Sequence, residues 1–202
     1  VYAVQLEKTR DAYIKAFVKK DGTMKDDYQG AYVMALKMVL PKGELWNKVY
    51  HQLVQRLTRD GMQTGFFATE HILPLLADNG DEKLAFDLLL DERCGGWMYQ
   101  VKAGATTTWE RWDAIRPDGT VNEAKSNGDN MVSFNHYSLG SVGKFYYQYI
   151  LGIQPLEPGF AKIKIRPRID SRIGAFSGSY KDILVAYDGK TLHISTPADT
   201  QI

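Results

Sequence analysis

The chain has 202 residues, of which 44% are hydrophobic and 12% aromatic, and this is enough to bury one sizeable core. Its 25 Lys and Arg residues against 24 Asp and Glu residues leave no basic surplus to hold a nucleic-acid backbone. Apolar runs such as Ile183–Tyr187 are too short to cross a bilayer. We therefore expect neither a nucleic-acid nor a membrane partner. The single cysteine, Cys94, has no internal disulfide partner, which fits a reducing compartment but leaves the localisation open.

The first part of the chain has the apolar spacing of amphipathic helices. Gly22, Pro41 and Gly61 are placed where three of these helices should end. Residues 94–135 lack a helical period and are rich in turn residues, and an irregular segment of this length in a compact domain is usually functional. Helices are predicted over residues 1–19, 28–40, 44–59, 69–77, 81–91 and 136–151.

The hydrophobic period changes at Gly152. Residues 161–165 alternate between apolar and basic side chains, as in a half-buried strand, and Ile183–Tyr187 should form a hairpin with residues 192–194 around Asp188-Gly189. The pattern predicts a mainly α fold of helical hairpins, arranged as a solenoid or an α/α toroid, over residues 1–152. An incomplete antiparallel β region follows over residues 153–202.

Both ends of the sequence look internal to a longer protein. Val1 opens directly on a helical pattern, and residues 196–202 end inside an apparent β region. We therefore expect the chain to be a fragment, and the lack of a signal segment gives no information on its compartment.

The segment with the clearest chemistry is residues 104–113, in which Glu110 lies between Trp109 and Trp112 and beside Arg111. Indole faces stack on the C–H surfaces of sugars, and carboxylates carry out acid–base steps on glycosidic bonds. The alternative is a tryptophan-rich loop packed on the helices, with Glu110 held in an ion pair with Arg111 or another neighbour.

A second segment, Ser133–Tyr137, places His136 at the start of the final predicted helix. A helix N-terminus favours a neutral imidazole, which can hydrogen-bond a hydroxyl group. The alternative is a capping Asn135 beside a purely structural His136. A third segment, Gln63–Thr69, is best interpreted as a glycine-containing turn between helices.

No sequence motif indicates a metal or a cofactor. His51 and His71 stand alone on helical patterns, and the chain has no HExxH, CxxC, GxGxxG, phosphate-binding loop or nucleophile elbow. Cys94 lacks a nearby histidine in the sequence and is interpreted as unreactive.

Several segments, taken in order and with their spacing, resemble the bacterial α-L-rhamnosidases of glycoside hydrolase family 78. The resemblance covers nearly the whole chain, and its most specific parts are ATTTWERW and SFNHY. The matching segments are Gly65-Phe66, Leu73–Leu76, Trp97–Tyr99, Gly104–Trp112 and Ser133–Tyr137.

The resemblance implies part of an (α/α)6 barrel followed by an incomplete β-sandwich, and hydrolysis of terminal α-L-rhamnosides with inversion. By the same resemblance, Glu110 corresponds to the general base and His136 lines the rhamnose subsite. Trp109, Trp112 and Asn135 are the further predicted substrate contacts. The expected substrate is a carbohydrate, a rhamnoside.

In that family the general acid lies in the first half of the barrel, and no counterpart of that segment occurs in this chain. The chain alone is therefore expected to be inactive, to need the missing N-terminal part of the same enzyme as its partner, and to self-associate through uncovered apolar faces. Two other functions stay open. One is a non-catalytic sugar-binding or interaction module on the same scaffold, and the other is hydrolysis of a different sugar, such as an unsaturated uronide.

Overall fold

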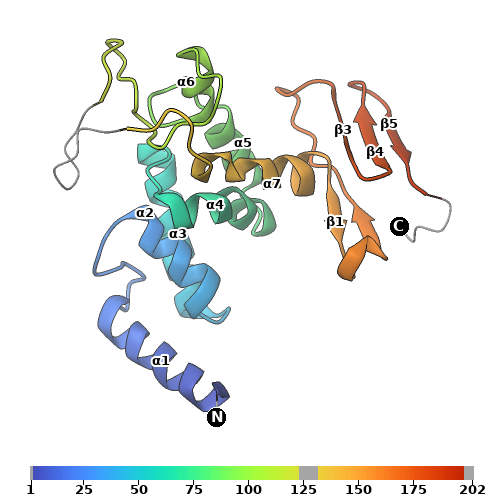
Figure 1. Ribbon diagram of the computed structural model, residues 1–202. Helices are drawn as coiled ribbons and strands as arrows, with labels where there is room; N and C mark the ends of the chain where they lie inside the picture. The colour runs from blue at the N-terminus through green and yellow to red at the C-terminus, as the bar shows by residue number, and fades with distance from the viewer. Residues whose placement is uncertain (1, 123–131, 198–202) are drawn as a thin grey trace. The chain divides into compact units, whose positions relative to one another are not determined.

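The structure is a computed structural model that describes residues 2–122 and 132–197 (Figure 1). The chain divides into two compact units, Val1–Gly140 and Ser141–Ile202. The boundary that the sequence predicts after residue 152 stays a prediction. Part of the loop before Val132 and the end of the last predicted β region lie outside the described residues.

The first unit consists of helical hairpins, as predicted (Figure 1). A short loop joins α2 and η1 to α3, another joins α4 to α5, and α2 also packs against α4. The elements are α1 (Tyr2–Phe17), α2 (Gln29–Met34), the π-helical turn η1 (Ala35–Val39), α3 (Glu44–Asp60), α4 (Phe66–Asp78), α5 (Glu82–Leu89) and α6 (Trp97–Lys102).

Helix α3 shows why the helical prediction succeeds. Its apolar residues recur at the spacing of one helical face, and Trp46, Val49, Leu53 and Leu57 are all buried. The helix ends at Gly61, whose φ of 70° is easily adopted only by a residue without a side chain. Periodicity and a terminating glycine together therefore define this element.

Helix α1 forms where the sequence predicts it, but none of its described residues is buried. Tyr13 and Ile14 are half-buried, whereas Ala16 and Phe17 on the predicted apolar face are exposed. Arg10 Nε donates a 2.8 Å hydrogen bond to the carbonyl of Val39, which links the helix to the end of η1. The predicted helix is confirmed, and its apolar face remains uncovered in this chain.

Helix α6 lies inside the segment that the sequence predicts to be irregular. The helix has only six residues, too few for a clear hydrophobic period, and glycines lie immediately before it and shortly after it. It is nevertheless well anchored, because the Trp97 indole N–H donates to the carbonyl of Leu139 at 2.9 Å and Gln100 is buried. The rest of the described segment consists of turns and short bridges, as expected.

The final predicted helix begins two residues late and is not regular. It runs from the 3₁₀ turn η2 (Ser138–Val142) through α7 (Gly143–Phe145) to the π-helical turn η3 (Tyr146–Ile150). Among the described residues, none of the helices is both apolar enough and long enough to cross a membrane.

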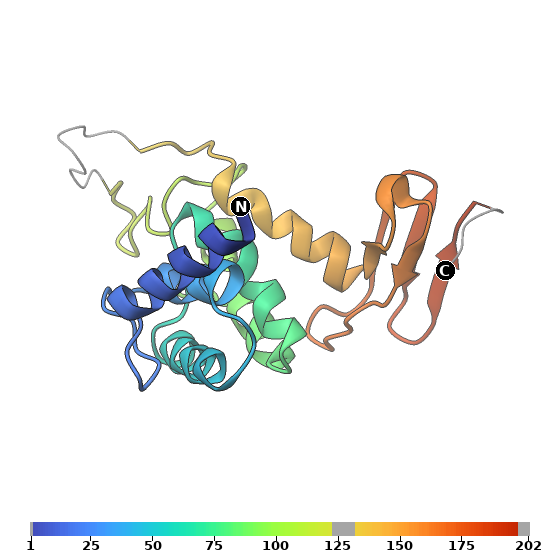
Figure 2. The same ribbon diagram turned by 90° about the horizontal axis from the view of Figure 1, so that it is seen from below.

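The second unit contains two small antiparallel sheets (Figure 2). Strands β1 and β2 form one sheet and β3, β4 and β5 form the other, with a core of Leu151, Ile153, Ile163, Ile183 and Val185. The strands are β1 (Ile153–Pro155), β2 (Ile163–Ile165), β3 (Phe176–Tyr180), β4 (Ile183–Tyr187) and β5 (Leu192–Ser195), with the 3₁₀ turn η4 (Pro158–Phe160) between β1 and β2.

The predicted hairpin of β4 and β5 is confirmed, with Val185 opposite Ile194. Its turn lies one residue further along than predicted, because Asp188 N–H donates to the carbonyl of Thr191 and so brackets the turn. The Asp188 side chain also accepts the N–H groups of Lys190 and Thr191. These two N–H groups hold the pKa of Asp188 below its usual range.

Candidate active site

Glu110 lies on the irregular loop after α6, and a second loop segment pairs with it. The Glu110 backbone N–H donates to the carbonyl of Ser133 at 2.9 Å, and the Ser133 N–H donates to Oε2 of the Glu110 carboxylate at 2.8 Å. The Glu110 side chain is half-buried. Because both its backbone and one carboxylate oxygen are held by the same residue, the carboxylate has a fixed direction.

His136 lies on that same second segment. Its N–H donates to the carbonyl of Thr108 at 2.8 Å, and the Thr108 hydroxyl donates to the carbonyl of His136 at 2.7 Å. The Thr107 hydroxyl adds a further hydrogen bond, to the carbonyl of Phe134. The two motifs that the sequence singled out are therefore side by side in space, although more than twenty residues separate them in the chain.

The His136 imidazole accepts a hydrogen bond from a residue two positions further along the chain. The Ser138 N–H donates to Nδ1 at 3.3 Å, so the first residue of η2 provides a donor to the ring. His136 thus precedes the helix by two residues instead of starting it. Asn135 is exposed, and its backbone N–H donates to the Ser133 hydroxyl at 3.2 Å.

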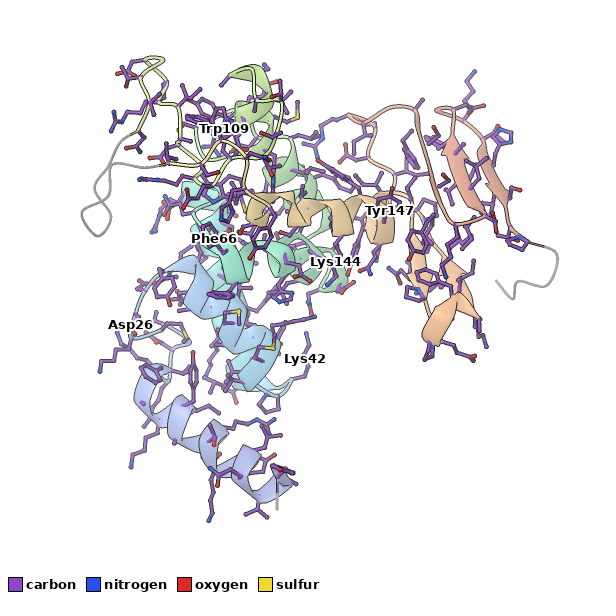
Figure 3. All side chains as sticks on the ribbon, viewed as in Figure 1. Asp26, Lys42, Phe66, Trp109, Lys144 and Tyr147 are labelled. Carbon is purple, nitrogen blue, oxygen red and sulfur yellow. The ribbon has the colours of Figure 1, made fainter. Side chains whose placement is uncertain are left out.

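The two tryptophans of the motif pack against other aromatic side chains, and Trp109 is labelled in Figure 3. Trp109 is only 3% exposed and lies edge-to-face against Phe134 at 5.7 Å between ring centroids. Trp112 is half-buried and lies edge-to-face against Trp97 at 5.0 Å, and its indole N–H donates to the carbonyl of Thr64 at 2.8 Å. Their described contacts support the loop, and direct sugar contact by either indole stays a prediction.

Arg111 pairs with Asp113, at 3.4 Å between Nε and Oδ1. Asp113 also accepts a 2.6 Å hydrogen bond from the side-chain amide of Asn122. The sequence offered Arg111 as an ion-pair partner for Glu110, but among the described residues Arg111 pairs with the carboxylate of Asp113. The described donor to the Glu110 carboxylate is the backbone N–H group of Ser133.

Phe66, which the sequence placed in a turn between helices, contacts the candidate site in the structure. Phe66 lies at the start of α4 (Figure 3). Its ring stacks on the His136 imidazole at 4.7 Å between centroids, and the carbonyl of Thr64 in the preceding loop accepts the Trp112 indole N–H. The only sequence signal for this contact was the Gly65-Phe66 pair within the family resemblance.

Two further titratable side chains near the loop, Cys94 and Tyr99, have raised pKa values. Burial raises the pKa of the Cys94 thiol, a direction that disfavours the reactive thiolate. Burial and the neighbouring Cys94 likewise raise the pKa of Tyr99, whose hydroxyl donates to the carbonyl of Ile115 at 2.8 Å. Within residues 2–122 and 132–197, His, Cys, Asp and Glu side chains do not gather in threes that could hold a metal ion.

Comparison with known proteins places this fold and loop in a family. Residues 1–150 match the bacterial alpha-L-rhamnosidase 6 hairpin glycosidase domain. An alpha-L-rhamnosidase of Streptomyces avermitilis is 38% identical over 169 residues, and one of Alteromonas sp. is 36% identical over 154 residues. These matches cover 83% and 75% of this chain, and each covers 16% of the relative.

Solved structures agree with the sequence matches. The crystal structure of the Streptomyces avermitilis alpha-L-rhamnosidase complexed with L-rhamnose superposes with a TM-score of 0.86 at 33% identity, and the match covers 98% of this chain and 20% of that one. The native enzyme of Aspergillus terreus gives a TM-score of 0.74 at 31% identity, covering 83% and 19% of the two chains.

The first unit is a domain built of helical hairpins, and it carries Glu110 on a long connecting loop. Within the class of hairpin-built helical domains, the chain belongs to the family of bacterial α-L-rhamnosidase six-hairpin glycosidase domains. The family resemblance and the predicted fold class are thereby confirmed. The chain spans about a sixth to a fifth of the length of the relatives that it matches.

Proposed function

We propose that this chain supplies the general-base side of the catalytic centre of an inverting α-L-rhamnosidase. The observation that carries the proposal is the pairing of the two loop segments. Hydrogen bonds between Glu110 and Ser133, and between Thr108 and His136, bring the Glu110 carboxylate and the His136 residue onto adjoining loop segments.

In the proposed reaction, the Glu110 carboxylate accepts a proton from a water molecule while that water attacks the anomeric carbon. The C–O bond to the leaving group breaks, and a carboxylic acid on the opposite side of the sugar protonates the departing oxygen. The two carboxyl groups of an inverting glycosidase lie roughly 6.5–9.5 Å apart, which leaves room for the water. The acid would come from the part of the relatives' length that this chain does not span.

The roles of the other predicted residues follow from their contacts. His136 would donate its Nε2–H to a rhamnose hydroxyl, because Nδ1 already accepts the Ser138 N–H. Trp109, at 3% exposure, would act by packing under the Glu110 loop. Trp112 would hold the same loop through Thr64, and Asn135 would meet substrate as an exposed residue beside His136.

The relatives favour the substrate assignment. Both are alpha-L-rhamnosidases, and the Streptomyces avermitilis structure holds L-rhamnose. A terminal α-L-rhamnoside is therefore the substrate class we propose for the gene product that contains this chain.

The test uses the gene product that contains residues 1–202, with an aryl α-L-rhamnoside as substrate and NMR to identify the first anomer released. Wild type should release β-L-rhamnose, the inverted anomer. Glu110→Gln should keep the fold and lower kcat by about 10²–10⁴-fold, the usual contribution of a positioned general base. Glu92→Gln is the matched control, since Glu92 is an exposed glutamate paired with Lys102.

Three results would contradict the proposal: near-normal turnover by Glu110→Gln, retention of the anomeric configuration, or an equal loss in Glu92→Gln. Saturable rhamnose binding without any turnover by the wild-type gene product would instead support the sugar-binding module.

A further inference from the structure

Three aromatic rings are stacked beside the Glu110 loop. The Phe66 ring lies 4.7 Å from the His136 imidazole at an interplanar angle of 24°, and the Tyr137 ring lies 5.1 Å from the same imidazole at 14°. Both are near-parallel arrangements within the range of favourable aromatic stacking. The imidazole that would meet the sugar thus has two aromatic neighbours in addition to the hydrogen bond at Nδ1.

The two neighbours differ in how firmly they are held. Tyr137 is 86% exposed, so its ring has little support from the protein. Phe66 is 43% exposed and is the first residue of α4, and Ala68 and Thr69, which follow two and three residues later, are both buried. Of the two rings, Phe66 is the one that can impose an orientation on His136.

The loop before Phe66 is itself fixed by several hydrogen bonds. The Thr69 hydroxyl donates to the carbonyl of Gly65 at 2.9 Å and lies 3.0 Å from the Thr64 hydroxyl. The Thr64 carbonyl accepts the Trp112 indole N–H at 2.8 Å. The segment that carries Phe66 is therefore tied to the motif that carries Glu110, as well as to His136.

The described hydrogen bonds of His136 fix its backbone but do not fix the tilt of its imidazole ring. Thr108 holds its backbone through two hydrogen bonds, and the Ser138 N–H reaches Nδ1 at a long 3.3 Å. An acceptor at Nδ1 places the ring proton of the neutral form on Nε2. Within residues 2–122 and 132–197, this long hydrogen bond is the one at the ring, so the aromatic contacts set the tilt of the imidazole.

We propose that Phe66 is a positioning residue, whose ring face holds the His136 imidazole so that Nε2–H points at one hydroxyl of the sugar. The inference deepens the proposed function and rests on it for the identity of that sugar. It gives the segment Gln63–Thr69 a role beyond that of a turn between helices.

The kinetic test compares Phe66→Leu with Phe67→Leu in the gene product that contains this chain. Phe67 is the adjacent residue on α4 and is 83% exposed, so it controls for the loss of a ring at the start of the helix. Phe66→Leu should raise KM for an aryl α-L-rhamnoside by about 3–10-fold, the usual range for a stacked pair, with a smaller change in kcat. Phe66→Tyr should restore the wild-type KM, and Phe67→Leu should leave it unchanged.

A double-mutant cycle separates positioning from general damage to the fold. If Phe66 acts through the imidazole, Phe66→Leu should have no further effect on KM in a His136→Ala background. An undiminished effect in that background, or a wild-type KM for Phe66→Leu alone, would overturn the inference.

A second readout does not depend on activity. In the 202-residue chain with ¹⁵N-labelled histidines, long-range ¹H–¹⁵N spectra should show one imidazole, assigned by its loss in His136→Ala, as the Nε2–H tautomer. Phe66→Leu should shift or average that signal, and Phe67→Leu should leave it in place. Identical His136 signals in wild type and Phe66→Leu would overturn the inference. If these signals respond as expected but the gene product lacks rhamnoside hydrolysis, only the proposed function fails.

Discussion

Individual hydrogen bonds decide the shape of the candidate site. The Trp112 indole N–H, the Ser133 N–H and the Thr108 hydroxyl each bind a group on a different segment of the chain, and together they hold the Glu110 and His136 loops in place. None of the three is a reacting group in the proposed mechanism. The geometry of the candidate site therefore depends on groups that take no part in the proposed reaction.

Trp112→Phe tests this point, because it keeps an aromatic ring but removes the N–H that Thr64 accepts. The matched control is Trp46→Phe, which removes a comparable 3.1 Å hydrogen bond from the Trp46 indole to the carbonyl of Leu36. Each variant should lose about 0.5–1.5 kcal/mol in the free energy of unfolding, measured with urea. In the gene product, only Trp112→Phe should also lower kcat/KM. An equal loss of kcat/KM in both variants would show that stability alone was affected.

At the scale of single residues, the sequence predicted the motif but not its surroundings. Glu110 stood out as a carboxylate between two tryptophans, and His136 by its place at the start of a predicted helix. The family resemblance then gave each residue its expected role. Phe66 and Thr64 could not be found in the same way. Their roles arise only when a loop more than forty residues away in the chain is folded against Trp112 and His136.

Among the elements, α3 also anchors the loop that follows α1. Arg56 on α3 binds both carboxylate oxygens of Asp27, at 2.6 and 2.8 Å, and the buried Tyr32 donates its hydroxyl to Asp27 at 2.6 Å. These two partners lower the pKa of Asp27 to about 2. Burial and the same carboxylate raise the pKa of Tyr32 to about 12.

Asp27→Asn should therefore destabilise the chain in a pH-dependent way. The pKa of Asp27 is lowered on folding, so its contribution to stability is present above about pH 4 and is lost as the pH falls toward 2. Because the Asp27 side chain is 55% exposed, solvent screening reduces the expected difference at pH 7 to about 1 kcal/mol.

Urea unfolding of wild type and Asp27→Asn between pH 2 and pH 7 measures that difference. It should shrink toward zero at the acidic end, because protonation of Asp27 in wild type removes the charge that the variant lacks. A difference between wild type and Asp27→Asn that stays constant down to pH 2 would contradict the ion-pair interpretation.

The helices and strands differ in how well the sequence alone predicts them. Long helices with a buried face, such as α3, and a hairpin with alternating residues, such as β4 and β5, carry their own signal and were predicted. Strands β1 and β3 and helix α6 are short, and glycines or prolines interrupt their patterns, so tertiary contacts determine them. The Trp97–Leu139 hydrogen bond beside α6 is one such contact.

For the whole molecule, one exposed apolar surface is that of α1. Tyr2, Val4 and Leu6 are 90%, 61% and 53% exposed, and no described residue of this helix is buried. Since the chain spans only part of its relatives' length, we propose that the remainder of such a protein covers this face.

The 202-residue chain by itself should therefore self-associate. Sedimentation velocity should show a weight-average mass that rises with concentration, and Val4→Lys together with Leu6→Lys should reduce that rise. Lys8→Glu, which changes charge on α1 without removing apolar surface, is the control. A monodisperse monomer of the wild-type chain at all concentrations would contradict the prediction.

Azide tests most directly whether the Glu110 carboxylate deprotonates the attacking water. Azide is a nucleophile that needs no base, so in the gene product the inactive Glu110→Ala variant should regain turnover of an aryl α-L-rhamnoside when azide is added. Attack from the side that Glu110 occupied should yield β-L-rhamnosyl azide, identified by NMR. Hydrolysis by Glu110→Ala at near wild-type rate without azide, or an α-L-rhamnosyl azide as the product, would contradict the account.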